Sequence, residues 1–523
     1  MKTLLQKSKL LLIVLVLQTI GSTIFSQTTE KEIQALEGKI VVNAKTDIAF
    51  KQRLANGGIN LKGDITLIAN SIVSKNQNGT KSNDDYSGSE SNGFLNMDYI
   101  DIDSDPTTFS SSKSQLTLPN CSRVVFAGLY WAAVYPKESW NNSNARKSDF
   151  NKIKFKLPGQ TTYQNITGEI IYDDGSANQK PYAVYKDVTD IVSGLTNPNG
   201  DYYAANIRAT VGKDANGLGS SGGWILVVIY ENELEPSRRI SIFDGFSSVG
   251  GGDEVDLSYS GFNTIPQGKV KAKMLVAALE GDKSISGDRF KIKDVGGTYR
   301  SLSTTNLNSK WNFFNGSITV EDTYLANRKP NSKNTLGFDA DLFTINNVNN
   351  KLITNGQTKA DIKLTSSQDV YWVFLNAMSV DIIEPNIELV KTIDDGNGND
   401  IAGKDVDLGD ALWYNIRFKN KGNDDAVNTV LIDRLPKNVD LLETELIVPD
   451  GITYTYDPPT AATEFRGILK FNIPNSFVKE GDGAENIRIK VKVVENCNEL
   501  RDVCSNKICI FIMCLSSTHF NDG

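Results

Sequence analysis

The sequence predicts an all-β protein, and two observations carry this prediction. Runs of strand length, rich in β-branched and aromatic residues, recur along the chain with turn signals between them. Helical periodicity is nearly absent, and only one short helix is expected, within residues 181–195. The predicted strands lie at residues 64–72, 122–133, 224–230, 239–243, 269–279 and 369–383. Several of these runs are almost continuously apolar, which is typical of strands buried on both faces.

A different pattern begins near residue 411. Apolar and polar residues alternate there, with Leu412, Tyr414, Ile416 and Phe418 on one side of the pattern, and the alternation returns at residues 487–493. Because residues two apart in a strand point to the same face, both segments predict strands with one buried face. Two layers of such strands form a sandwich.

The length and one proline divide the chain. A chain of 523 residues predicts roughly two to four domains. Pro385 follows an apolar strand, and proline cannot continue a central β-ladder. We therefore predict a large N-terminal β-sandwich module at residues 27–383, jelly-roll-like and built as one region or as two lobes. A second, immunoglobulin-like sandwich is predicted at residues 384–506.

The second module also carries a family resemblance. Its motifs are Leu408-Gly409-Asp410 before the alternating strand, Asn420-Lys421-Gly422 after it, and then Asp433-Arg434-Leu435-Pro436. Residues 387–442 resemble the conserved-repeat family called Domain of Unknown Function 11, an immunoglobulin-like β-sandwich of bacterial cell-surface proteins. The resemblance implies a spacer or adhesin module and supplies no catalytic residues. Residues 98–119, 123–136 and 221–233 resemble the large β-rich module that precedes such repeats in surface proteins of Bacteroidetes.

The N-terminus has the layout of a secretory signal peptide. Lys2, Lys7 and Lys9 precede an apolar run at residues 10–17, and small or polar residues follow up to Ser26. A membrane-anchoring helix is the alternative, but about 20 apolar residues are needed to span a bilayer and this run is shorter. We predict a signal peptide at residues 1–26, export to the cell surface or the medium, and no membrane span after its removal.

The charge pattern argues against nucleic acid as a partner. The net charge is −8, and the 55 basic residues are scattered along the chain, whereas nucleic-acid binding depends on clustered cations. An acidic, polar surface suits a solvated extracellular protein. The expected partner is an extracellular glycan or protein surface.

Two loops contain side-chain oxygens at the close spacing that calcium requires. Asp101, Asp103 and Asp105 alternate in the first loop. The second loop contains Asp395, Asn397, Asn399 and Asp400. Neither loop has the glycine and glutamate positions of an EF-hand. We predict calcium at both loops, with solvated turns as the alternative, and no other cofactor.

Enzymatic chemistry has little support in the sequence. The only histidine is His519, in a segment that looks unstructured, so a Ser-His-Asp or Cys-His site has no plausible base. The glycine-rich residues 217–222 lead into a strand and not into the helix that a dinucleotide-binding turn needs. We predict a non-catalytic, secreted or cell-surface structural or adhesion protein whose repeat domain acts as a stalk. The alternative is a carbohydrate-binding module or a polysaccharide-active enzyme, because paired carboxylates remain open among 63 acidic residues.

Tryptophans are the candidates for contacts with sugars. Trp224 and Trp372 lie in apolar runs and are expected in the core. Trp140, between Ser139 and Asn141, is the predicted ligand-binding residue, and Trp413 is a second surface candidate.

The C-terminal region contains four of the five cysteines. Cys497 and Cys504 lie in one polar loop and form a candidate disulfide, whereas Cys121 is expected to be buried and unpaired. Residues 507–523 differ from what precedes them, and we interpret this tail as a truncation or frameshift near Asn506. The protein would then lack a C-terminal sorting signal and stay in the periplasm. The alternative is a short apolar strand at residues 508–515 that completes the sandwich.

Overall fold

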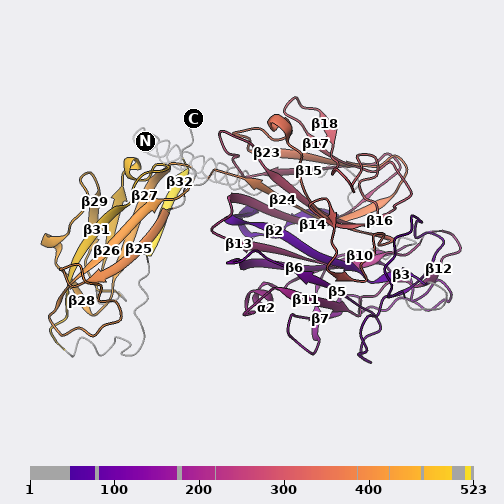
Figure 1. Cartoon of the computed structure of the whole chain (residues 1–523), viewed down its shortest axis with the longest axis horizontal. Coiled ribbons are helices and arrows are strands. Elements are labelled where there is room, and N and C mark those ends of the chain that lie inside the picture. Colours follow the sequence, from indigo (N-terminus) through magenta and orange to yellow (C-terminus); the bar gives the residue numbers. More distant parts are fainter. Residues whose placement is uncertain are drawn as a thin grey trace, which may run out of the picture. The chain divides into compact units, whose positions relative to one another are not determined.

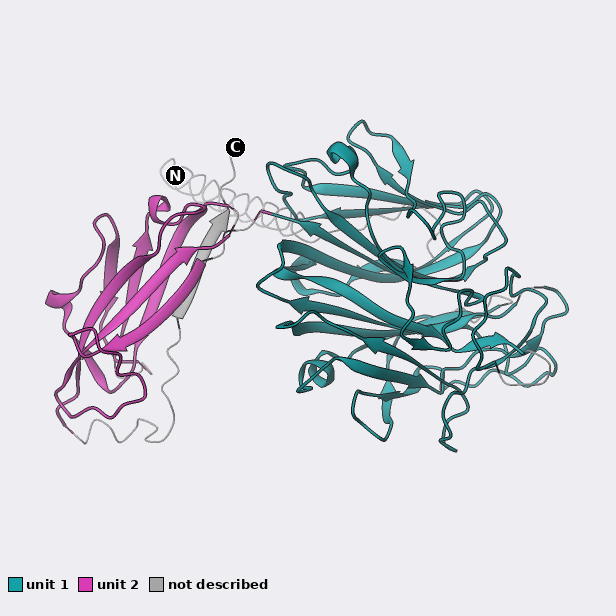
Figure 2. Cartoon of the chain, in the orientation of Figure 1, with its two compact units in different colours: residues 1–382 teal, residues 383–523 magenta. Residues whose placement is uncertain are grey.

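The structure, a computed structural model, divides into two compact units (Figure 2). It describes residues 48–76, 82–173, 179–217, 219–383, 385, 387–422, 424–460 and 465–496, and the backbone of 513–519. Unit 1 ends at Ile382 and unit 2 begins at Ile383, next to the predicted boundary. The predicted signal peptide, Cys497 and Cys504 lie outside the described residues. Strands account for almost all regular structure, so the all-β prediction is confirmed.

A long, strongly bent sheet of twelve strands forms the centre of unit 1 (Figure 1). Its order is β20 (Thr323–Tyr324), β19 (Ile318–Val320), β22 (Gly337–Thr344), β16 (Ala272–Gly281), β24 (Tyr371–Asp381), β14 (Ser237–Val249), β2 (Ile59–Ser71), β13 (Gly222–Glu231), β6 (Arg123–Val134), β10 (Pro181–Asp187) and β9 (Glu169–Asp173). Strand β1 (Ile48–Gln52) pairs with β14. All six predicted strands of this unit belong to the sheet.

Three smaller sheets complete unit 1. One has the order β21 (Arg328–Lys329), β5 (Ser111–Leu116), β11 (Gly200–Ala205), β7 (Lys152–Lys156) and β8 (Gln164–Thr167). A second contains β15 (Glu254–Ser260), β23 (Lys359–Thr365), β17 (Arg289–Lys293) and β18 (Tyr299–Ser301). The third is β12 (Gly212–Lys213), β4 (Asn96–Tyr99) and β3 (Val73–Lys75).

Figure 1 shows the layers of strands in unit 1. Three apolar cores lie between these layers. The first, with Trp131 and Trp224, lies between the central sheet and the β5–β11 layer. The second, with Phe246 and Phe338, lies between the two halves of the bent central sheet. The third, with Phe290, lies between the central sheet and the β15–β23 layer. Strands with a core on both sides have no polar face, which explains their continuously apolar sequences.

Strand β2 joins the two halves of the central sheet. Its first residues pair with β14, and from Gly63 onward it pairs with β13. Gly63 has φ +157°, and a Cβ built on it would lie 2.0 Å from the Tyr230 carbonyl oxygen. Only glycine therefore fits where the strand passes from one half to the other.

Unit 2 is an immunoglobulin-like sandwich of two four-stranded sheets. One sheet has the order β25 (Ile387–Asp394), β26 (Ala411–Asn420), β31 (Glu485–Val493) and β28 (Val439–Leu441), and the other β29 (Thr453–Asp457), β30 (Gly467–Ile473), β27 (Ala426–Leu435) and β32 (Met513–His519). The alternation in β26 and β31 is confirmed, since both strands bury their apolar face in one core. Lys391 Nζ lies 2.7 Å from Asp433 Oδ1, an ion pair between the two sheets.

Strand β32 corrects one expectation about the tail. His519 was expected in an unstructured segment, but it ends β32, which pairs antiparallel with β27. A strand added at the edge of β27 satisfies backbone groups of that edge that would otherwise be unpaired. Strand β32 overlaps the strand predicted at residues 508–515, and residues 508–512 lie outside the described residues.

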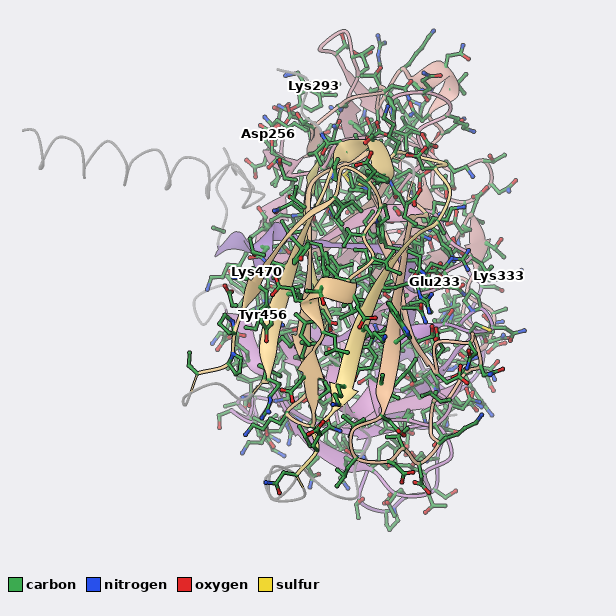
Figure 3. The ribbon with its side chains drawn as sticks, turned by 90° about the vertical axis from the view of Figure 1, so that its left-hand side faces the viewer. Glu233, Asp256, Lys293, Lys333, Tyr456 and Lys470 are labelled. Carbon is green, nitrogen blue, oxygen red and sulfur yellow. The ribbon has the colours of Figure 1, made fainter. Side chains whose placement is uncertain are left out.

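Helices are few and short in the described residues. They are α2 (Thr189–Ser193), within the predicted range, and single turns at Ala55–Gly57, Val348–Asn350, Glu443–Glu445 and Asn475–Phe477. None of them has the length and apolar character needed to cross a bilayer. Charged side chains such as Asp256 and Lys293 of unit 1 and Lys470 of unit 2 lie on the outer surfaces (Figure 3).

Candidate functional site

The first predicted calcium loop is a turn in which each carboxylate has its own hydrogen-bond partners. Asp103 Oδ2 accepts from the Tyr163 hydroxyl at 2.5 Å, and its Oδ1 accepts from the Asp105 amide at 3.1 Å. Asp101 Oδ1 accepts from Ser111 Oγ at 3.0 Å. Burial alone would raise the pKa of Asp103, but these hydrogen bonds, from Tyr163 above all, lower it. The carboxylates therefore fix the turn.

The second predicted loop is built in the same way. Asp395 Oδ1 accepts from the amides of Asn397 and Asn399 at 2.9 and 3.2 Å, and its Oδ2 accepts from Asn399 Nδ2 at 2.9 Å. The Asn399 side chain and these amides lower the pKa of Asp395 to about 2. Asp400 instead accepts from the Ala402 amide at 2.8 Å. Asn397 contributes its backbone amide to this turn.

Neither loop gathers a ready-made set of metal ligands. In the described ranges, no three histidine, cysteine, aspartate or glutamate side chains form a group that would hold a metal ion. Both loops are Asx turns, in which the side chain replaces a backbone acceptor. Calcium binding at Asp101, Asp103 and Asp105, or at Asp395 to Asp400, stays a prediction.

The tryptophans divide into buried and accessible ones. Trp224 and Trp372 are buried, as predicted. Trp140 is half buried against the second core, and its indole Nε1 donates to Ser220 Oγ at 2.7 Å. Trp311, which the sequence analysis did not single out, is 49% exposed, and the Arg289 guanidinium lies 3.9 Å from its ring centre. Trp311 lies between the polar residues Lys310 and Asn312, and this context in the sequence could have predicted that its ring is exposed.

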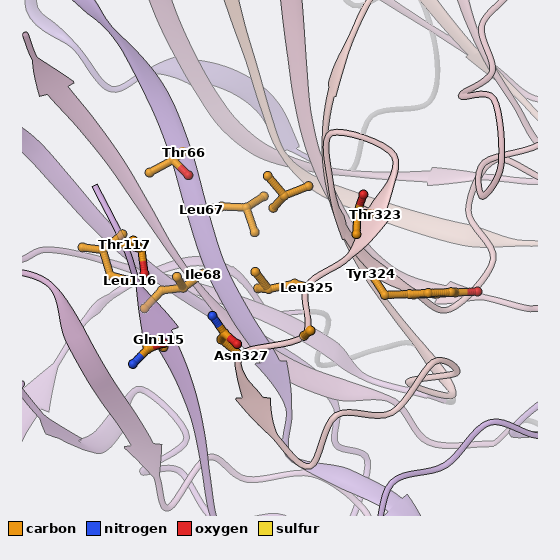
Figure 4. A pocket seen from close by; sticks show the side chains of 12 residues that line it. Thr66, Leu67, Ile68, Gln115, Leu116, Thr117, Thr323, Tyr324, Leu325 and Asn327 are labelled. Atoms are coloured by element: carbon orange, nitrogen blue, oxygen red, sulfur yellow. The ribbon is translucent and has the colours of Figure 1, made fainter. Parts of the chain in front are cut away.

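A shallow pocket of about 270 Å³ lies between β2, β5 and the segment 320–327 (Figure 4). Its polar lining consists of hydroxyl and amide groups, including those of Gln115, Thr323, Tyr324 and Asn327, and no lining residue is charged. A neutral, polar ligand of small size matches this lining. A larger hollow of about 760 Å³ runs between β6 and α2, and its Arg53 is paired with Glu169 and Asp244.

The most unusual arrangement of charge is a set of six buried carboxyl groups at one end of the central strands. Strand β16 ends there, β22 and β24 begin there, and β17 begins directly after one of the six residues. Each carboxylic residue is at most 9% exposed. We call this set the acidic rim cluster, and its members are Glu280, Asp282, Asp288, Asp339, Asp341 and Asp369.

Sequence reasoning missed this cluster. Its members come from four separate stretches of the chain, namely residues 280–282, Asp288, residues 339–341 and Asp369, so their spacing does not reveal the cluster. One signal was available in β22, where Asp339 and Asp341 alternate with apolar residues. Two residues at this spacing share a face of the strand, and here that face points into the third core, beside Phe343.

Burial dominates the acid–base properties of the acidic rim cluster. It raises the pKa of Asp282 to about 6, of Asp288 to about 7, and of Glu280 and Asp369 to about 8. It also raises the pKa of Asp339, and the neighbouring Asp341 adds to this effect. Among the described residues, no lysine or arginine is a leading influence on the pKa of any of these six groups.

Cys121 corrects a further expectation. It was expected to be buried, but it is exposed, and it is the free cysteine of the described residues. It has φ +64° and follows Asn120 in the turn before β6. A turn of this kind lies at the surface, because its backbone polar groups need water or hydrogen-bond partners.

No protein-family model matches the chain, and no curated protein matches it. Solved structures give distant similarities. The N-terminal domain of the Streptococcus gordonii adhesin Sgo0707 is 9% identical over 89% of this chain and 92% of its own, with a TM-score of 0.20. A putative membrane anchored protein from Corynebacterium diphtheriae is 8% identical over 88% and 92%, with a TM-score of 0.17. A native alpha-2-macroglobulin fragment from Escherichia coli is 9% identical over 40% of this chain and 28% of its own, with a TM-score of 0.15. TM-scores of this size carry no assignment of function.

Proposed function

We propose that the protein is an exported, non-catalytic structural or adhesion protein of the bacterial cell surface. In this proposal unit 1 binds an extracellular glycan or protein through its loops. Unit 2 is a conserved-repeat module that acts as a spacer, as its resemblance to Domain of Unknown Function 11 implies.

The observation that carries the proposal is that long loops of unit 1 are held in place by side chains. Asn347 Nδ2 donates to the carbonyl oxygens of Val270 and Ile353 at 3.0 and 2.7 Å, and its Oδ1 accepts from the Leu352 amide at 3.0 Å. Asp322 accepts from the amide of Asn306 in the same way. Loops fixed before binding lose little entropy when a ligand arrives, which is what a binding surface on a β-scaffold requires.

Two further observations support the non-catalytic and spacer parts. The single histidine, His519, lies in an edge strand of unit 2, far along the chain from the loops of unit 1. Unit 2 has its own core and an ion pair between its two sheets. A unit with its own core can fold and bear load as a separate element.

Protease shaving of intact cells tests surface display. An epitope placed in a surface turn of unit 2 should disappear from intact cells of the native host after brief protease treatment, and a periplasmic marker should persist. Protection of the epitope in intact cells, with loss only after the envelope is opened, would contradict the proposal.

The uncharged pocket favours a second candidate, a carbohydrate-binding module. Its hydroxyl and amide lining, with the Tyr324 ring at the edge, matches the neutral polar surface of a sugar. A glycan array separates the candidates. Binding that is lost in Tyr324→Ala, but kept in Trp140→Ala, would place a sugar in this pocket. Loss in Trp140→Ala alone would favour the residue predicted from the sequence.

A further inference from the structure

A row of lysine and tyrosine side chains crosses the sheet that contains β5, β7 and β11. Strand pairing places Lys113 of β5 opposite Lys329 of β21 on one side and opposite Tyr203 of β11 on the other. Tyr203 in turn lies opposite Lys156 of β7. Residues directly opposite each other in neighbouring strands have their side chains on the same face of the sheet. Four strands therefore contribute one residue each to a single line, which we call the lysine–tyrosine row: Lys329, Lys113, Tyr203 and Lys156.

The lysine–tyrosine row lies on the outer face of this sheet. Residues that alternate with it, such as Phe155 and Ala204, are buried in the first core. Because successive residues of a strand point to opposite faces, the row points away from that core. Lys329 is exposed, and the side chain of Lys113 is 29% exposed. Figure 1 shows β5, β7 and β11 in the outermost layer on this side of unit 1, so the row is accessible from solution.

Aromatic rings hold two of the ammonium groups in place. Lys156 Nζ lies 4.0 Å from the ring centre of Tyr203 and 4.7 Å from that of Tyr163. Lys113 Nζ lies 5.7 Å from the ring centre of Tyr203. Tyr163 is itself fixed, because its hydroxyl donates to Asp103. An aromatic face attracts a cation, and a side chain that is held before binding loses less entropy when a ligand arrives.

Two carboxylates approach the row, and both already have partners. Asp201 Oδ2 lies 2.5 Å from Lys113 Nζ and pairs with it. Hydrogen bonds from Thr107 lower the pKa of Asp105 most, and the positive charges of two lysines of β7 add to this effect.

Other lysines of this face have no carboxylate partner. Within the described part of the chain, Lys152, Lys154, Lys156 and Lys329 form no ion pair. The first three alternate along β7, so they share its outer face. The face therefore carries unpaired positive charge on a protein whose net charge is −8.

The sheet that contains β15, β23 and β17 has a different arrangement on its outer face. There Lys359 lies 3.0 Å from Asp361, and Lys363 lies 3.4 Å from Asp256 and also pairs with Glu254. These lysines are compensated by carboxylates of the same or a neighbouring strand. Most lysines on the face of the lysine–tyrosine row are not.

The lysine–tyrosine row adjoins the uncharged pocket. Gln115 lies two residues after Lys113, and Asn327 lies two residues before Lys329. Both Gln115 and Asn327 line the pocket (Figure 4), and the Gln115 amide donates to the Asn327 carbonyl oxygen at 2.7 Å. Groups that can bind hydroxyls therefore lie next to groups that can bind anions.

We propose that the lysine–tyrosine row binds an acidic polysaccharide, with the ammonium groups of Lys329, Lys113 and Lys156 at its carboxylate or sulfate groups. This proposal rests on the proposed binding of an extracellular glycan by unit 1, and it names the chemical class of that glycan. Positive charge attracts such a polymer, and the hydroxyls of the polymer match the lining of the adjoining pocket.

Single-stranded nucleic acid is the competing polyanion. Its bases stack on open aromatic rings, whereas an ammonium group already occupies a face of Tyr163 and of Tyr203. The row therefore favours a polymer that needs charge and hydroxyl contacts and no stacking platform.

Binding of the purified full-length protein to two acidic polymers tests the proposal. Polygalacturonate presents carboxylates, dextran sulfate presents sulfates, and neutral dextran is the control polymer. Biolayer interferometry should show binding to at least one acidic polymer, and weaker or no binding to dextran. The affinity should fall by at least about tenfold between about 50 and 200 mM salt, because the contacts are charged.

Variants assign the binding to the row. The triple variant Lys113→Gln, Lys156→Gln and Lys329→Gln should lower the affinity by at least about tenfold. Tyr203→Leu, which keeps every charge, should lower it by about threefold, because two lysines lose the ring that holds them. If the triple variant does not fold, Lys329→Gln alone, at an exposed side chain, should lower the affinity by about twofold to threefold.

The matched control removes the same charge from the other outer face. The triple variant Lys293→Gln, Lys359→Gln and Lys363→Gln should change the affinity by less than about twofold, since these lysines lie in another sheet.

Three results would overturn the proposal. The first is that neither acidic polymer binds. The second is an equal loss of affinity in the two triple variants, because net charge and not the row would then govern binding. The third is tighter binding of single-stranded oligothymidylate than of either acidic polymer, because the face would then be a nucleic-acid site. Surface display is measured separately by protease shaving, so a displayed protein that binds neither polymer keeps the proposed function and loses this site.

Discussion

Buried carboxyl groups lie at both ends of strands β14, β16 and β24, but within the described part of the chain only those at one end form ion pairs with basic side chains. At one end, Arg238 lies 3.2 Å from Asp64 and 3.1 Å from Asp381, and Lys273 lies 2.9 Å from Asp64. At the other end of the same strands lies the acidic rim cluster, where no basic side chain of the described residues is a leading influence on the pKa of Glu280 or Asp369. We refer to the first as the paired end.

The difference shows what offsets the free-energy cost of burying a carboxylate at each end. At the paired end, burial raises the pKa of Asp381, and the Arg238 guanidinium opposes this rise. At the acidic rim cluster, no guanidinium group is a leading influence, and burial raises the pKa of Asp282 to about 6 and of Glu280 and Asp369 to about 8. The carboxylates of the paired end are therefore compensated within the chain, whereas those of the acidic rim cluster depend on bound protons.

The largest expected effect on stability comes from a substitution that breaks the ion pairs of the paired end. Arg238→Met removes the cation that Asp64 and Asp381 share and leaves two buried carboxylates with less compensation. Removing one partner of a buried ion pair costs about 3–5 kcal/mol. Equilibrium unfolding in denaturant should show a loss of this size in the free energy of unfolding. Arg300→Ala, which breaks the exposed pair with Asp294, is the matched control and should change stability by less than about 1 kcal/mol.

The second prediction concerns pH in the absence of divalent cations. Burial raises the pKa of Asp282 to about 6, of Asp288 to about 7 and of Glu280 to about 8. The unfolded chain releases these protons near pH 4, so the native state binds more protons between about pH 4 and pH 8. The stability from these groups is fully present below about pH 4 and is lost as pH rises through the folded pKa values.

Unfolding in the presence of a chelator measures this slope. The free energy of unfolding should fall steadily from about pH 5 to about pH 8. Asp339→Asn, which removes one titrating group, should reduce the slope and be at least as stable as the wild-type protein at the upper end. A flat profile, or a rise in stability over this window, would contradict the account of the cluster.

The third prediction is smaller and concerns the acidic turn at Asp103. Asp103→Asn keeps the shape of the side chain but weakens the charge-assisted hydrogen bonds from Tyr163 and the Asp105 amide. The expected loss of stability at neutral pH is about 1 kcal/mol. If the free energy of unfolding in the presence of a chelator falls by more than about 3 kcal/mol, the turn stabilises the protein by more than its hydrogen bonds account for.

The smallest expected effect on stability is that of Trp311→Ala. The ring is half exposed and its main contact is the Arg289 guanidinium, and a cation–π contact of this kind is worth about 0.5–1 kcal/mol. Thermal unfolding should show a change of no more than about 2 °C. Glycan binding that falls with unchanged stability would identify Trp311 as a ligand contact.

The sequence predicted the strands far better than the site. Strands β13 and β26 were predictable because a strand with two buried faces is continuously apolar and one with a single buried face alternates. The bend of the central sheet at Gly63 was not predictable, because it depends on the approach of the Tyr230 carbonyl oxygen.

The acidic rim cluster was not predictable for a similar reason. Glu280 and Asp369 lie 89 positions apart and meet only because β16 and β24 are antiparallel neighbours. Close spacing drew attention to Asp101 to Asp105 and to Asp395 to Asp400, where the carboxylates cap their own turns. Closely spaced acidic residues in loops have local backbone amides available, whereas acidic residues brought together by strand pairing do not.

The central claim is that burial without a basic partner raises the pKa values of the acidic rim cluster. Titration of the carboxyl groups by NMR, in protein labelled with carbon-13 at aspartate and glutamate, tests it most directly. The account predicts carboxyl titrations between about pH 6 and about pH 8 that disappear in Asp288→Asn and Asp369→Asn. Titration of every carboxyl group below about pH 5 would contradict the account.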